Sequence, residues 1–131
     1  AYGADGFGFT DVLYLDYTGG VDLSDSFFLG INAAYANSSD ADGGYQGVAL
    51  YLQNEFSETF SLGLRPEMFI ASSGSDDATV SAFTLTGNLS LTDTLKIISE
   101  FRYDTSDDMI IPGFPTDKNM SGATIAAVYS F

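Results

Sequence analysis

Apolar residues recur at every second position along most of this chain. Around residue 30, for example, Phe27, Leu29 and Ile31 alternate with Gly30 and Asn32. Successive side chains of a β-strand point to opposite faces, so a period of two predicts strands with one apolar and one polar face. The pattern recurs in seven segments, at residues 13–18, 27–35, 48–53, 60–70, 83–91, 95–104 and 123–131. We therefore expect an all-β protein, an antiparallel up-and-down meander of about seven strands.

The segments between the predicted strands alternate in length. Short turns are expected at residues 22–26, 55–59 and 92–94, and long loops at residues 37–44, 72–77 and 105–118. Successive connections of a meander lie at opposite ends of the sheet, so the long loops are expected to share one end. They contain Asp40, Asp42, Asp76, Asp77, Asp107, Asp108 and Asp117.

The apolar face has two interpretations. In a soluble sandwich or barrel it points inward, whereas in a transmembrane barrel it meets lipid and the polar face lines the interior. The polar face is rich in Gly, Ala, Ser, Thr and Asn, unlike a solvated surface, and the strands are long enough to cross a membrane at a tilt. Aromatic residues are expected near strand ends, as in an interfacial girdle: Tyr17, Phe27, Tyr35, Phe56, Phe60, Phe101, Tyr103, Tyr129 and Phe131. These features favour part of a transmembrane β-barrel.

The amino-acid composition excludes several classes of function. The 131 residues include 18 Asp and Glu but only 4 Lys and Arg, a net charge of −14, although 45% of residues are hydrophobic. With so few basic groups, we expect no nucleic-acid partner. Cys and His are absent, which excludes disulfides, thiolate zinc sites and a Ser-His-Asp triad, so we expect no enzyme. We also expect no cofactor and no metal site, because the segment 40–44 lacks the bidentate Glu of a calcium loop. A loose calcium contact at Asp76 and Asp77, or at Asp107 and Asp108, stays open as an alternative.

A small set of charged residues falls on the predicted polar face. They are Arg65, Glu67, Lys96, Glu100 and Arg102. Charges inside a pore set its field and its ion preference, so these residues are candidates for the pore lining. The same residues can also form a lattice of ion pairs that fills the lumen, and both interpretations stay open. The acidic excess predicts a mild preference for cations.

The end of the chain resembles a known signal. Residues 126–131 form an alternating run that ends in Phe131, with Tyr129 two residues earlier, similar to the terminal strand by which the barrel assembly machinery recognises bacterial outer-membrane proteins. Segments 47–52, 62–69, 84–89 and 100–104 resemble the OmpL-like β-barrel porins, over about residues 10–131. The resemblance implies a bacterial outer-membrane location, outer-membrane lipid as surroundings and passive diffusion of small hydrophilic solutes or cations.

The number of strands has a further implication. If Phe131 lies at the periplasmic end, the long loops are extracellular, and counting back seven strands places residues 1–8 on the extracellular side as well. A complete single-chain bacterial barrel has an even number of strands. We therefore expect residues 1–131 to be a single β-barrel segment, the C-terminal part of a larger barrel. The alternative is a self-assembling structural protein, a homo-oligomer that forms a multi-chain barrel or a surface fibre.

Overall fold

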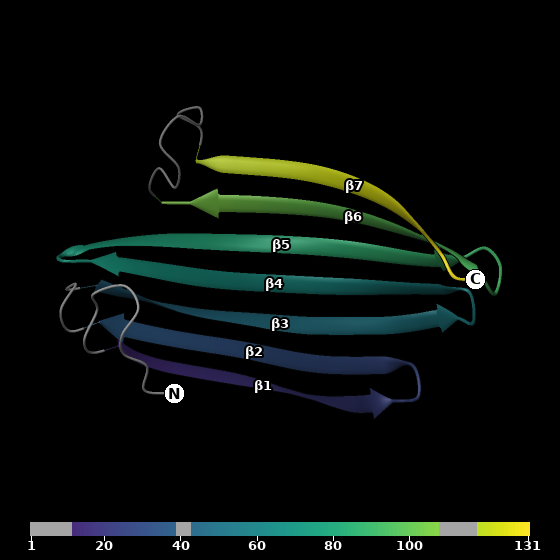
Figure 1. The fold of residues 1–131 in the computed structure, drawn as a ribbon, viewed down its shortest axis with the longest axis horizontal. Coiled ribbons are helices and arrows are strands. Elements are labelled where there is room, and N and C mark those ends of the chain that lie inside the picture. The colour runs from purple at the N-terminus through teal and green to yellow at the C-terminus, as the bar shows by residue number, and fades with distance from the viewer. Residues whose placement is uncertain (1–11, 39–42, 108–117) are drawn as a thin grey trace.

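The computed structural model describes residues 12–38, 43–107 and 118–131 as one antiparallel sheet. Its strands are β1 (Val12–Ser24), β2 (Phe27–Ser38), β3 (Gly43–Ser57), β4 (Phe60–Ser73), β5 (Asp76–Ser90), β6 (Leu95–Ser106) and β7 (Asn119–Tyr129). Each strand pairs with the next in the chain, and the spatial order is the sequence order (Figure 1). The predicted seven-stranded meander is confirmed.

The strands are longer than the alternation alone indicates. β3 begins at Gly43 and β5 at Asp76, where Gly, Ser and Asp residues interrupt the apolar pattern but the pairing with the neighbouring strand continues. The shortest strand has 11 residues and the longest have 15. At about 3.3 Å per residue and a tilt of about 40°, even the shortest strand spans the roughly 25 Å apolar band of a barrel wall.

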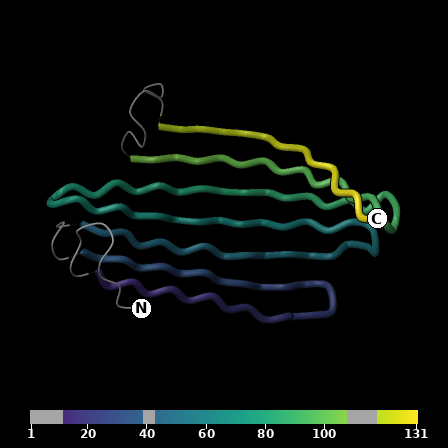
Figure 2. Tube along the Cα trace, in the orientation of Figure 1, coloured from purple at the N-terminus to yellow at the C-terminus, as the bar shows by residue number. Residues whose placement is uncertain are grey.

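One of the predicted long loops is a tight turn in the structure. Residues 72–77 were expected to form a long loop, but Ser73 pairs with Asp76, so only Gly74 and Ser75 connect β4 to β5. Gly74 has a φ of 63°, a left-handed conformation that lets so short a connection reverse the chain. Asp77 therefore lies within β5 and not in a loop. Figure 2 shows this tight reversal between β4 and β5.

The left-handed backbone at Gly74 predicts that replacing this glycine lowers the stability of the fold. Gly74→Ala is expected to lower the free energy of unfolding by about 1 kcal/mol, because a Cβ atom is unfavourable at this φ. Gly122→Ala on β7 is the matched control, since a Cβ there would meet nothing within 4 Å and no positive φ opposes it. Denaturant titration of both variants in lipid measures the difference, and equal losses would contradict the role assigned to Gly74.

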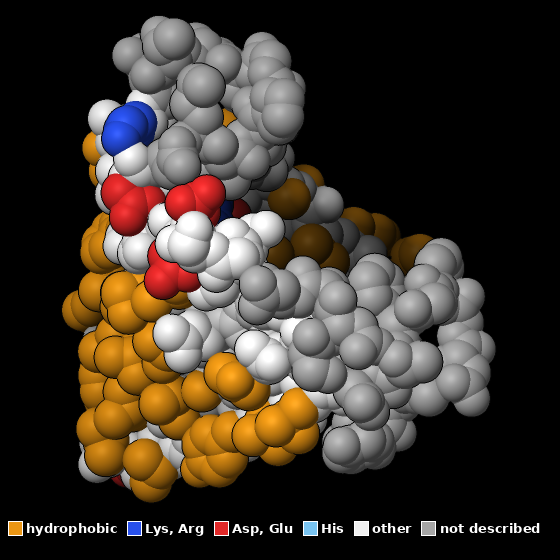
Figure 3. Space-filling model, turned by 90° about the vertical axis from the view of Figure 1, so that its left-hand side faces the viewer, with side chains coloured by type: hydrophobic (Ala, Val, Ile, Leu, Met, Phe, Trp, Pro, Cys, Tyr) orange, Lys and Arg blue, Asp and Glu red, His pale blue; other side chains and the backbone are white. Residues whose placement is uncertain are grey.

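The register separates the side chains into two faces. The apolar face includes a row of paired residues that crosses all seven strands: Val21, Leu29, Leu52, Leu64, Leu85, Phe101 and Ala123. The polar face includes another such row: Thr18, Asn32, Ala49, Glu67, Ala82, Asp104 and Met120. By this alternation every charged strand residue lies on the polar face except Asp77, near the start of β5. In the space-filling view, hydrophobic side chains gather along one flank of the sheet (Figure 3).

The aromatic girdle is only partly as predicted. Phe27, Phe56, Phe60 and Tyr129 lie at the end of the sheet that carries the turns at residues 25–26 and 58–59, and the rings of Phe56 and Phe60 are 5.9 Å apart between centroids. Tyr17 and Phe101, which were expected near strand ends, lie in the middle of β1 and β6. The alternation places these residues on the correct face, but it does not mark where a strand ends.

The sheet has no hydrophobic core among its described residues. The buried hydrophobic side chains are only Ala36, Ala49 and Ala82, and all three lie on the polar face. On the apolar face Leu15 is 56% exposed and Ile125 is 78% exposed. The accessible surface is 9349 Å², against about 6,700 Å² for a globular monomer of this mass. The apolar face is therefore an outer face that needs an apolar medium.

Both edges of the sheet are open. Within the described residues β1 and β7 each pair with one strand only, and they do not pair with each other. Because an odd number of antiparallel strands separates them, β1 and β7 run in the same direction. The part of the chain that the structure describes contains no helix long and apolar enough to cross a membrane.

Candidate pore-lining charge cluster

Three neighbouring strands bring four charged residues together on the polar face. Arg65 of β4 and Arg102 of β6 both pair with Thr84 of β5, so these three residues form one row. In the adjacent row Glu67 of β4 and Asp104 of β6 both pair with Ala82. The result is a patch in which two guanidinium groups face two carboxylates. We call Arg65, Glu67, Arg102 and Asp104 the charge cluster.

Arg102 is the centre of the charge cluster. Its Nε donates to both carboxylate oxygens of Asp104, at 3.0 and 3.1 Å, and its Nη2 donates to Oδ1 of Asp104 at 2.8 Å. Nη2 also donates to Oε1 of Glu67, and Nη1 donates to Oγ1 of Thr84 at 3.3 Å. Arg102 can reach across β5 because the intervening Ala82 is small. Asp104 and Thr84 are buried beneath these contacts, at 7% and 2% exposure.

Arg65 is held differently. Its Nε lies 2.9 Å from Oε2 of Glu67, which makes an ion pair. The N–H is not directed at that oxygen, however, and the buried Nε has no hydrogen-bond partner among the described residues. The guanidinium carbon also lies 6.0 Å from the centre of the Tyr51 ring, within the range of a cation–π contact. Arg65 is therefore positioned by its charge interaction with Glu67 and by the ring of Tyr51, and not by a hydrogen bond from its Nε to a described residue.

The charge cluster unites three of the five predicted pore-lining residues, Arg65, Glu67 and Arg102. Lys96 and Glu100 share the polar face but lie nearer the end of the sheet that carries the turns at residues 25–26 and 58–59. Lys96 is exposed, and Glu100 accepts a hydrogen bond from Thr86 at 3.2 Å. Sequence reasoning did not select Asp104 or Thr84. A signal for Asp104 was present, because Arg102 and Asp104 repeat the Arg-x-acid spacing of Arg65 and Glu67.

The predicted assembly signal lies on the edge strand. Tyr129 ends β7, pairs with Leu95 and is 63% exposed, and Phe131 is fully exposed. Both side chains are accessible to a binding partner, and their role in recognition stays a prediction.

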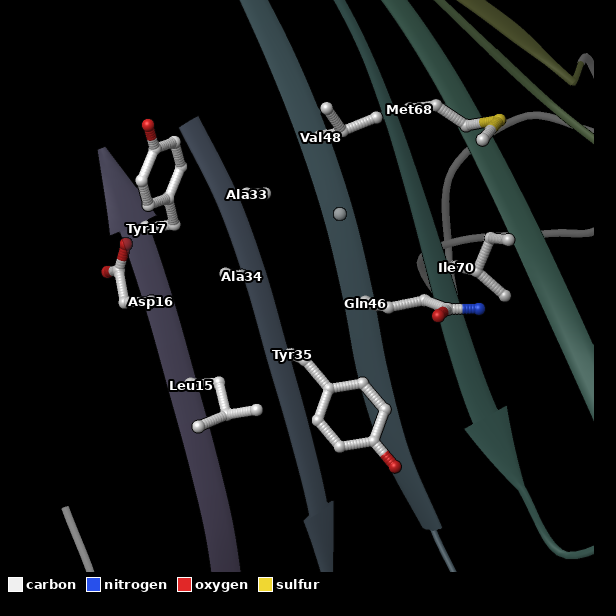
Figure 4. Close-up of a pocket in the computed structure, with 11 residues that line it drawn as sticks. Leu15, Asp16, Tyr17, Ala33, Ala34, Tyr35, Gln46, Val48, Met68 and Ile70 are labelled. Atoms are coloured by element: carbon white, nitrogen blue, oxygen red, sulfur yellow. The ribbon is translucent and has the colours of Figure 1, made fainter. Parts of the chain in front are cut away.

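Each face of the sheet carries a hollow. One, of about 400 Å³, is on the polar face beside Glu67 and Arg102. The other, of about 490 Å³, is a groove on the apolar face over β1 to β4. Figure 4 shows this groove, with Ala33 as a low point between Tyr17 of β1 and Val48 of β3.

The acidic segments show no metal cluster in the described ranges. Asp76 and Asp77 are consecutive in β5, so their side chains point to opposite faces and do not converge on one ion. Asp40, Asp42, Asp108 and Asp117 lie outside the described residues.

An antiparallel all-β sheet with an apolar outer face, and with every charged strand residue but Asp77 on the other face, defines the wall of a transmembrane β-barrel. The family model described as "Putative beta-barrel porin-2, OmpL-like" matches residues 4–131. The chain belongs to this family, which confirms the resemblance and extends it almost to the start of the sequence. No curated protein and no solved structure matches the chain.

Proposed function

We propose that this chain forms part of the wall of a porin-type channel in the bacterial outer membrane, through which small hydrophilic solutes or ions diffuse passively. The observation that carries this proposal is the segregation of charge: of the charged strand residues, only Asp77 is on the apolar face. A charged side chain facing lipid is costly, whereas one facing a water-filled lumen is not. The apolar face then contacts lipid, and the groove over β1 to β4 can accommodate a hydrocarbon chain.

The orientation follows from the family pattern. Phe131 lies at the periplasmic end together with the turns at residues 25–26 and 58–59, and the connection between β6 and β7 is extracellular. The exposed β7, with Tyr129 and Phe131, is then the strand that the barrel assembly machinery recognises.

The polar face predicts the ion preference. Its strand residues include seven acids and three bases, which leaves 3 − 7 = −4. The acids are Asp16, Asp22, Glu55, Glu67, Asp76, Glu100 and Asp104, and the bases are Arg65, Lys96 and Arg102. The charge cluster contributes zero, because its two arginines balance its two carboxylates. The excess therefore comes from acids that lie outside it, of which Glu100 is one.

Channel recordings test this proposal. The protein is reconstituted in a planar lipid bilayer under a KCl gradient. We expect a reversal potential whose sign indicates cation preference, and we expect this preference to be weaker at high salt because salt screens the charges. Glu100→Gln should lower that preference, because it removes one lumenal acid. Asp77→Asn removes the same charge from the opposite face and should leave it unchanged. Anion preference, or no conductance from folded protein, would count against the channel.

The self-assembly alternative has weaker support. The open edges β1 and β7 could pair with other copies. Copies inserted in the same orientation would bring β1 and β7 together in parallel, however, because the two strands run in the same direction. An antiparallel barrel closes only if an odd number of further strands lies between them. The porin proposal accommodates this requirement, whereas a barrel made of seven-stranded copies alone does not.

A further inference from the structure

The hollow on the polar face lies on the side of the charge cluster away from the two-residue turns at residues 25–26 and 58–59. Its volume of about 400 Å³ falls within the range of small-molecule sites, about 300–1,000 Å³. Tyr45 and Phe69 line one side, and Glu67 and Arg102 line the other. The floor consists of the small residues Ala34, Gly47, Ala49 and Ala82.

The aromatic side of the hollow is unusual for a polar face. Tyr45 is 39% exposed and Phe69 is 41% exposed, and their ring centroids are 5.6 Å apart with planes inclined by 31°. Gly47 pairs with Phe69, and a Cβ atom at position 47 would lie 3.3 Å from Cδ2 of that ring. The glycine thus gives the ring room to lie along the sheet. In the lumen of a barrel, these two rings offer an apolar platform to a solute in water.

The charged side of the hollow is already neutralised. The donors of Arg102 are directed at Asp104, Glu67 and Thr84, and both oxygens of Glu67 contact arginines. An ionic ligand would have to displace these pairs. A neutral ligand with hydroxyl groups would not, because carboxylate oxygens keep lone pairs that can accept further hydrogen bonds.

We propose that this hollow is a binding site for a neutral sugar, an inference that rests on the proposed role of the polar face as a lumen wall. The sugar places the C–H face of one ring against Tyr45 and Phe69, and its hydroxyl groups donate to the carboxylate of Glu67. The site would retain sugars at the wall of the channel, which a purely passive pore does not do. No bond is made or broken, and binding is reversible.

Calorimetric titration of the detergent-folded protein with maltotriose tests the site without requiring conduction. Phe69→Ala is expected to weaken maltotriose binding at least about fivefold, because it removes the main stacking surface. Phe69→Tyr, which keeps the ring, should stay within about twofold of the unsubstituted protein. Phe28→Ala is the matched control: Phe28 is an aromatic residue on the polar face of β2 that does not line the hollow, and its loss should leave affinity within about twofold.

Three results would overturn the proposal. They are the absence of maltotriose binding to folded protein, binding of the zwitterion glutamine in place of the sugar, and maltotriose binding that Phe69→Ala leaves intact. Circular dichroism of each variant confirms that the sheet is retained. A protein that conducts KCl but binds no sugar refutes this site and leaves the channel standing, whereas a protein that binds sugar but does not conduct refutes the channel.

Discussion

Replacement of Leu85 by arginine is expected to lower the free energy of unfolding in a phospholipid bilayer by about 2–4 kcal/mol. Leu85 lies within β5, in the apolar row that crosses all seven strands, between Leu64 and Phe101. Its side chain points into lipid if the apolar face is the outer face of a barrel. A guanidinium group there has no lumenal water, and within the hydrocarbon it can be solvated only by distorting the bilayer.

The adjacent position supplies the control. Thr86 follows Leu85 on the same strand, lies on the polar face and donates a hydrogen bond from its hydroxyl to Glu100. Thr86→Arg therefore introduces the same charge, at nearly the same depth, next to an acid, and the expected change in unfolding free energy is within about 1 kcal/mol. Guanidinium titration of both variants in the same vesicles gives the comparison. If Thr86→Arg costs as much as Leu85→Arg, the assignment of the two faces is wrong.

Arg102→Gln is expected to have the largest effect inside the charge cluster. It leaves the buried carboxylate of Asp104 without a charge partner, while Glu67 keeps its contact with Arg65. The expected loss of unfolding free energy is about 2–3 kcal/mol, below the full value for a buried pair because Arg102 is one-third exposed. The net charge of the cluster changes from zero to −1, so the cation preference of the channel should increase.

Lys96→Gln separates these two consequences. Lys96 is on the same face and strand as Arg102 but is exposed. Its removal should raise the cation preference as well, yet change the unfolding free energy by no more than about 0.5 kcal/mol. Denaturant titrations and reversal potentials of both variants distinguish the outcomes. Equal stability in the two variants would show that the charge cluster does not hold β4, β5 and β6 together.

The sequence predicted the number of strands and the face of each residue well, for a simple reason. A period of two is a local property, and a single strand such as β4 displays it completely, from Phe60 and Ser61 onward. Pairing with neighbouring strands adds no information about which way a side chain points. The polar face and its charged residues could therefore be identified before any register was known.

The contacts between charges could not be predicted in the same way. Glu67 and Arg102 are far apart in the chain, and they meet because the register sets both against β5 and because Ala82 is small enough to pass over. Alternation carries no register, so the sequence predicted a lattice of ion pairs without saying which charges meet, and Asp104 was not selected for it. Lys96 looked equivalent to Arg102 in the sequence, although it lies apart from the cluster.

The wrong prediction of a long loop at residues 72–77 has a physical cause. Residues 72–77 are rich in Ser, Gly and Asp, which are poor strand formers, so the sequence indicated a loop where the structure has a two-residue turn. Ser72 and Ser73 pair with β3 on one side and with β5 on the other, so β4 continues through them, because the ladder of backbone hydrogen bonds does not depend on the side chain. Composition shows where pairing is weak, but it does not show where pairing stops.

Cysteine labelling along β5 tests the central claim most directly, that the apolar face meets lipid and the polar face meets water. The chain contains no cysteine, so single substitutions from Leu85 to Leu89 introduce unique labels. In sealed vesicles, a charged water-soluble maleimide is expected to modify cysteine at Thr86 and Asn88 and to leave cysteine at Leu85 and Leu89 unmodified. The opposite alternation, or equal labelling at all of these positions, would contradict the account.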